Sequence, residues 1–81
     1  MQDDVRSVLA DTLQLGARAQ ALNADSGLLG SLPELDSMAV VAVITALEER
    51  FGIVVDDDEI TADTFATLGT LTAFVTDKIK A

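Results

Sequence analysis

Residues 36–52 have the sequence DSMAVVAVITALEERFG, which contains the clearest helical pattern in the chain. Its apolar side chains recur at spacings of three and four, which is typical of a helix with one face in a core. The members of that face are Val40, Val43, Ile44, Leu47 and Phe51. Asp36 suits the N-cap, and Gly52 can adopt the left-handed conformation that ends a helix. The stretch therefore predicts one long helix.

Two further helices are expected at the ends of the chain. The first has an apolar face made by Val5, Val8, Leu9, Thr12 and Leu13, with Gly16 as its expected end. The last has an apolar face made by Leu68, Leu71, Phe74, Val75 and Ile79. After an acidic turn at 56–59, a short helix capped by Thr61 is expected over residues 61–65.

The connection between the first two long helices lacks helical periodicity. Residues 15–35 contain the turn signal NADSG at 23–27 and a proline at 33, although 17–22 could hold one helical turn. Four leucines are expected to hold this loop against the core: Leu28, Leu29, Leu32 and Leu35. The sequence thus predicts a single all-α domain over 1–81. It is a small four-helix bundle of three longer helices and one short helix, with a long loop between helices one and two.

The charge and residue types exclude several classes of function. Fourteen acidic and five basic residues give a net charge of −9, which disfavours binding to nucleic acid or anionic lipid and favours a partner with a basic surface. The chain has no Cys or His, so zinc sites and Ser-His or Cys-His catalysis are excluded. No signal-peptide pattern and no apolar run of about 20 residues is found. We expect a cytoplasmic monomer without membrane insertion.

The acidic run at 56–59 invites comparison with a calcium-binding loop. An EF-hand that began at Asp56 would need an oxygen ligand, a glycine and a glutamate where this chain has Ile60, Thr61 and Thr67. The carboxylates also lack the signs of a buried acid-base pair. We therefore predict neither a metal site nor catalytic residues.

The junction Asp36-Ser37-Met38 is the candidate site. Asp36 is expected to accept the amide hydrogen of Met38 or Ala39, which would make Ser37 the first helical residue with its hydroxyl outside the core. A phosphodiester there would be stabilised by the positive end of the helix. An Asp-Ser dipeptide alone is usually no more than a helix cap, so its surroundings decide the interpretation.

Those surroundings are LLGSLPELDSM at 28–38, ALEERFG at 46–52, DDDEI at 56–60 and TFATLGTL at 64–71. With them the chain resembles acyl carrier and peptidyl carrier proteins over nearly its whole length. The resemblance implies that a phosphopantetheinyl transferase attaches 4'-phosphopantetheine from coenzyme A to Ser37, with Asp36 as cap and recognition residue. It implies a non-enzymatic carrier that holds acyl or aminoacyl intermediates as thioesters. Its further partners would be a loading ligase and downstream acyl-transferring enzymes.

The chain differs from many carrier proteins of fatty-acid synthesis in the residues that follow Ser37. Many of them have acids two and five residues after the modified serine, where this chain has Ala39 and Ala42. This disfavours a housekeeping role in fatty-acid synthesis. The stretch around Ser37 also resembles stand-alone carriers of exosortase and exopolysaccharide systems. A partner-binding surface is expected on the outer side of the central helix, made by Met38, Val41, Thr45, Glu48 and Glu49.

Three questions stay open: the type of cargo, the space that could hold it, and whether the chain is modified at all. The cargo could be a fatty acyl, aminoacyl or polyketide chain. Seven apolar residues could line a space for it between the helices, although a role as plain core is favoured: Val43, Ile44, Leu47, Ile60, Phe65, Leu68 and Leu71. The chain could instead be an unmodified helical adaptor that binds partners through its acidic surfaces.

Overall fold

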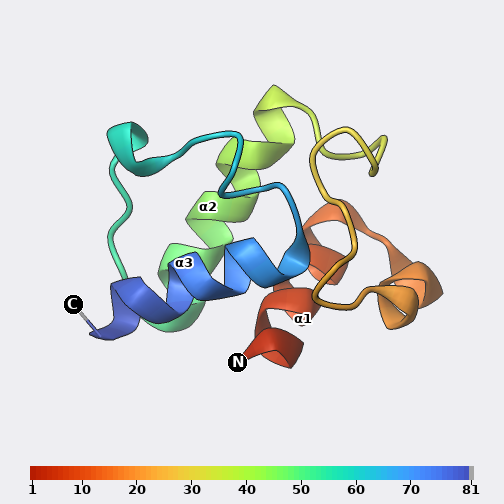
Figure 1. Ribbon diagram of the computed structural model, residues 1–81, viewed down its shortest axis with the longest axis horizontal. Helices are drawn as coiled ribbons and strands as arrows, with labels where there is room; N and C mark the ends of the chain where they lie inside the picture. The colour runs from red at the N-terminus through yellow and green to blue at the C-terminus, as the bar shows by residue number, and fades with distance from the viewer. Residues whose placement is uncertain (81) are drawn as a thin grey trace.

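The computed structural model describes residues 1–80, apart from the side chain of Asp57. It contains the helices α1 (Gln2–Leu13), α2 (Ser37–Phe51) and α3 (Leu68–Lys80), with the short 3-10 helices η1 (Gly16–Ala21) and η2 (Asp57–Glu59). α1 packs against both other long helices, and α3 crosses in front of α2 in Figure 1. The predicted all-α fold, with three long helices and a long connection before the second, is confirmed.

Both ends of α2 form as the sequence predicts. Asp36 has an extended backbone, and its Oδ1 accepts the amide hydrogen of Ala39 at 2.8 Å. Gly52 ends the helix with a left-handed backbone of φ 66°, and its N–H donates to the carbonyl of Glu48. Because the groups that fix these ends are local, α2 keeps its register whatever packs against it.

The end of α1 was predicted wrongly. The helix stops at Leu13, before the expected Gly16, and Gln14 takes a left-handed conformation with φ 54°. The early stop turns the chain so that Leu15 enters the core at 4% exposure. Gly16 also has a positive φ but begins η1, which confirms the helical turn expected in 17–22.

The short helix expected over 61–65 is also misplaced, since the 3-10 turn of this region is η2. Residues 61–65 form hydrogen-bonded turns, in which Thr64 N–H donates to the Thr61 carbonyl at 3.1 Å. The carbonyls of Phe65 and Ala66 accept hydrogen bonds from Leu29 and Leu28. These hydrogen bonds join the end of the segment to the long loop.

Backbone hydrogen bonds join the long loop to the start of α3. They run from Leu28 to Ala66, Leu29 to Phe65, Leu68 to Ser26 and Gly69 to Ala24, at 2.9 to 3.1 Å. These four hydrogen bonds hold the long loop in position although it has little helical structure. Leu28 and Leu35 are buried as predicted, but Leu29 is 45% exposed and does not anchor the loop.

The core lies between the three long helices and this loop. Nine side chains are fully buried: Phe65, Leu9, Leu28, Leu47, Leu68, Leu71, Val5, Val43 and Val75. Two of them, Leu28 and Phe65, come from irregular segments, so the loops supply part of the core. Within residues 1–80, no helix is long and apolar enough to cross a membrane.

Candidate functional site

Ser37 is the first residue of α2, and it is exposed to solvent. The preceding residues fix its place, since Leu35 is buried at 5% exposure and Asp36 is the N-cap. The carbonyl of Asp36 accepts the N–H of Val40 at 2.9 Å, so the helical pattern begins directly at this point. The hydroxyl therefore stands at the positive end of a helix of 15 residues.

A hollow of about 380 Å³ opens beside this serine. We call it the Ser37 hollow, and it is lined by Leu29, Ser37, Val40, Ile60, Thr61, Ala62 and Phe65. Its walls come from the long loop, from α2 and from the segment that precedes α3. The hydrogen bond from Leu29 N–H to the Phe65 carbonyl, 2.9 Å long, holds two of these walls together. The hollow offers mostly apolar surface next to the serine hydroxyl.

A second hollow, of about 410 Å³, continues along α2. We call it the helix groove, and it is lined by Val40, Val41, Ile44, Thr45, Glu48, Val55 and Ile60. Val40 and Ile60 line both hollows, so the two adjoin. Glu48 closes the far end, where its Oε2 accepts the amide hydrogen of Val55 at 2.9 Å. The two hollows together follow α2 from Ser37 to its last turn.

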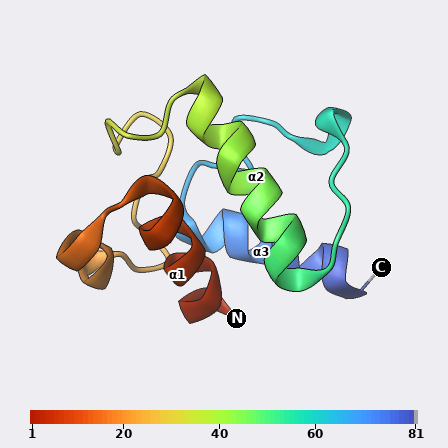
Figure 2. The same ribbon diagram turned by 180° about the vertical axis from the view of Figure 1, so that it is seen from behind.

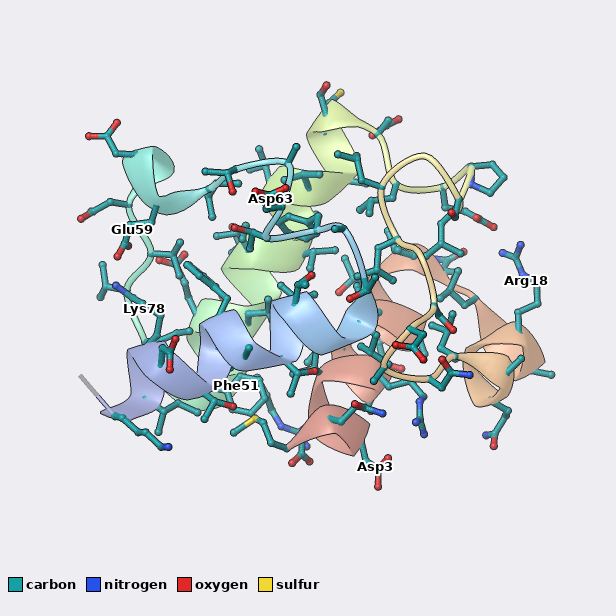
Figure 3. The ribbon with its side chains drawn as sticks, viewed as in Figure 1. Asp3, Arg18, Phe51, Glu59, Asp63 and Lys78 are labelled. Atoms are coloured by element: carbon teal, nitrogen blue, oxygen red, sulfur yellow. The ribbon has the colours of Figure 1, made fainter. Side chains whose placement is uncertain are left out.

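A carboxylate on η2 fixes the outer wall of the groove. Glu59 Oε1 and Oε2 accept hydrogen bonds from Lys78 Nζ at 2.8 and 2.9 Å, and Oε2 also accepts the N–H of Asp56 at 2.9 Å. The hydrogen bonds from Lys78, followed by that from the Asp56 backbone, lower the pKa of Glu59 below 4.5. Figure 3 shows the two side chains between η2 and the end of α3. This contact ties the segment that carries Val55 and Ile60 to α3.

The residues predicted for partner binding divide between two sides of α2. Met38 and Val41 are 82% and 65% exposed, and Thr45 is exposed on the same face. Glu48 borders the helix groove. Glu49 instead lines a separate hollow against α1, with Val8, Asp11, Thr12, Ala46 and Arg50. Val41, Thr45 and Glu48 therefore line one groove, Met38 is exposed at the start of the helix, and Glu49 borders the hollow against α1.

The seven apolar residues considered as the lining of a cargo space fall into two groups, one in the core and one along the helix groove. Val43, Leu47, Phe65, Leu68 and Leu71 are at most 1% exposed and belong to the core, and Phe65 also borders the Ser37 hollow. Ile44 and Ile60 are half-buried and line the helix groove. The sequence analysis did not single out Val55 or Ala62 as wall residues, because irregular segments carry no periodic pattern that could indicate which way they face.

The model of the family described as the phosphopantetheine attachment site matches residues 3–75 of the chain. The chain belongs to the phosphopantetheine-binding carrier proteins. It is also similar to the holo acyl carrier protein of Nitrosomonas europaea, whose structure was solved by NMR in solution. The two are 59% identical with a TM-score of 0.92, over 99% of this chain and 96% of that one. A comparison with curated proteins gave no match.

Membership of this family decides between the two functions that the sequence left open. The chain is an acyl carrier protein, its cofactor is phosphopantetheine, and it is a carrier and not a catalyst. The unmodified adaptor is thereby excluded. Among the described residues no group of three or more acidic side chains could hold a metal ion.

Proposed function

We propose that Ser37 is the residue of this carrier to which the phosphopantetheine arm is attached. The chain has four serines, and their surroundings differ. Ser7 lies within α1, Ser31 lies in the long loop, and the Oγ of Ser26 accepts the N–H of Asn23 at 2.8 Å. Ser37 alone among them combines an exposed hydroxyl, a helix start and an adjoining apolar hollow. This combination carries the assignment.

The residues around Ser37 fit a phosphodiester followed by a flexible chain. The positive end of α2 favours a phosphate on the serine oxygen. The Ser37 hollow offers apolar contact from Leu29, Val40 and Ile60. When bound, the arm supplies a thiol that carries the cargo as a thioester, which this chain without cysteine cannot supply itself.

The chain's own contribution is to position the hydroxyl and leave it accessible. A serine hydroxyl is a weak nucleophile without a base, and the chain contains no histidine to serve as one. The base and coenzyme A must therefore come with a phosphopantetheinyl transferase. Asp36 contributes by fixing the start of α2, so that Ser37 is presented in one orientation.

From the resemblance to carrier proteins we also infer two later kinds of partner. One is a ligase that loads the cargo, and the others are enzymes that take the cargo up. Ala39 and Ala42 stand where many fatty-acid carriers have acids, which disfavours a housekeeping role in fatty-acid synthesis. The stretch around Ser37 supports the narrower assignment to stand-alone carriers of exosortase or exopolysaccharide systems. We propose a single carrier domain over 1–81 that acts as a monomer. Its location in the cytoplasm stays a prediction.

Intact mass tests the assignment of Ser37. The purified apo protein is incubated with coenzyme A and a broad-specificity phosphopantetheinyl transferase, beside Ser37→Ala and Ser7→Ala. We expect the wild type and Ser7→Ala to gain the mass of one arm, and Ser37→Ala to gain none while its circular dichroism spectrum is unchanged. A folded Ser37→Ala protein that accepts the arm would place the attachment elsewhere.

A further inference from the structure

An ion pair joins η1 to the turn that leads into α2. Arg18 Nη2 donates a hydrogen bond to Oε2 of Glu34, across 16 residues of the chain. Arg18 is the only basic residue between Arg6 and Arg50. In Figure 3 its side chain extends from η1, and Figure 2 shows η1 below the part of the loop that leads into α2. The single positive charge of the long connection is thus placed against the segment before Ser37.

The short helix η1 is seated on the core, so Arg18 holds the turn from a fixed point. Leu15 and Ala19, on either side of Arg18, are both buried. The N–H of Arg18 donates to the carbonyl of Leu15 at 3.2 Å, and the N–H of Leu22 donates to that of Ala19 at 3.1 Å. The guanidinium therefore projects from a backbone that is already held in place.

The carboxylate of Glu34 depends on Arg18 for its hydrogen bonding. Its side chain is 31% exposed, and Oε1 is buried and has no hydrogen-bond partner among the described residues. A partly buried carboxylate that loses its charged partner gains free energy by moving into water. Removal of the guanidinium would therefore displace the Glu34 side chain and the turn that carries it.

The backbone of Glu34 connects this contact to the start of α2. Asp36 N–H donates to the Glu34 carbonyl at 3.2 Å, and Leu35 N–H donates to the Leu32 carbonyl at 3.0 Å. Asp36 in turn is the N-cap of α2, which requires its extended backbone. A displaced turn would loosen this cap, and Ser37, as the next residue, would then be presented in more than one orientation.

Resting on the assignment of Ser37, we propose that Arg18 is a positioning residue for loading, which acts through Glu34 on the N-cap of α2. In loading, the serine oxygen bonds to the phosphorus that carries the pantetheine chain of coenzyme A. Adenosine bisphosphate leaves with the electron pair of the broken P–O bond, and a base of the transferase takes the serine proton. Fewer productive orientations of the oxygen lower kcat. KM changes less, because the altered side chain lies outside α2.

Steady-state kinetics of loading test the proposal. The apo protein is incubated with coenzyme A and the broad-specificity transferase, and kcat and KM for the carrier are measured. We expect Arg18→Met to lower kcat about threefold and to change KM less than about twofold, in line with the modest strength of an exposed ion pair. In a Glu34→Met background, Arg18→Met should have no further effect, because no carboxylate is left for it to hold.

Hydrogen exchange separates positioning from a loss of global stability. In Arg18→Met we expect the amide hydrogens of Leu35 and Asp36 to exchange about threefold faster, with little change in the urea midpoint. Arg18→Lys keeps the charge and a donor, so it should restore most of kcat. A contact that only stabilised the fold would lower the urea midpoint and leave kcat unaltered.

Arg50→Met is the matched control, because it removes the same charge from a similarly exposed ion pair. Arg50 and Arg18 are 51% and 56% exposed, and Arg50 contacts Asp4 of α1 at 3.1 Å. This variant should leave kcat and the exchange of the Asp36 amide unchanged.

Three results would overturn the proposal: a wild-type kcat for Arg18→Met, equally slow loading of Arg50→Met, or a further slowing by Arg18→Met in the Glu34→Met background. Attachment at a serine other than Ser37, found by intact mass, would instead overturn the assignment on which the proposal rests.

Discussion

Asp36 is the residue on which the geometry of the site depends most directly. Its Oδ1 satisfies the N–H of Ala39, and its carbonyl accepts the N–H of Val40. Both bonds are made by one residue directly before Ser37, so the serine cannot shift relative to the helix without breaking them. The side chain thus acts on the modification by fixing where α2 begins.

Replacement of this cap should lower stability by a predictable amount. We expect Asp36→Ala to reduce the free energy of unfolding by about 1 kcal/mol, because an amide hydrogen at the helix start loses its acceptor. Asp36→Asn keeps an acceptor oxygen and should lose much less. Urea unfolding followed by circular dichroism measures both. Equal losses for the two variants would mean that the carboxylate charge matters and the cap does not.

At the scale of elements, the contact between η2 and α3 fixes the irregular segment beside α2. Glu59 and Lys78 are 19 residues apart, and their bidentate contact is partly buried. Glu48 holds the same segment from the other side through Val55. The outer wall of the helix groove is therefore fastened at both ends by carboxylates.

This contact should make stability depend on pH. The pKa of Glu59 is lowered in the folded protein, so its contribution is complete above the unfolded value of about 4.5 and is lost as the pH falls below that through the folded pKa. We expect Lys78→Met to unfold at lower urea concentration than the wild type near neutral pH, with the difference shrinking below about pH 4.5. In an NMR titration, the pKa of Glu59 should rise in this variant. An unchanged titration would show that Lys78 is not the cause of the shift.

For the whole molecule, the excess of negative charge limits stability. Four of the five basic side chains already contact acids: Arg6 with Asp3, Arg18 with Glu34, Arg50 with Asp4, and Lys78 with Glu59. The net charge of −9 nevertheless remains, and acids that repel one another destabilise a compact chain.

Added salt should therefore stabilise the folded protein. We expect the Tm to rise by several degrees between about 10 mM and about 0.5 M sodium chloride, because screening weakens the repulsion among the acids more than it weakens the few ion pairs. Circular dichroism during heating measures the Tm at each salt concentration. A Tm that falls with salt would mean that the four ion pairs contribute more than the repulsion.

The sequence alone determined the features that depend on neighbouring residues. Asp36 and Gly52 end α2 through local backbone geometry, and the apolar periodicity between them predicts which side is buried. The position of Ser37 at the first turn follows from the cap alone. The prediction that Ser37 is the attachment site needed more than the cap, because it rested on the resemblance of the surrounding stretches to carrier proteins.

Tertiary structure decided the surroundings of that site. The long loop pairs with the segment before α3 through Leu28 and Leu29, and Phe65 of that segment lines the Ser37 hollow. The same pairing leaves Leu29 exposed, contrary to its apolar character. No local pattern predicts a contact between residues 36 positions apart in irregular segments, because which carbonyl meets which N–H is fixed only when the helices pack.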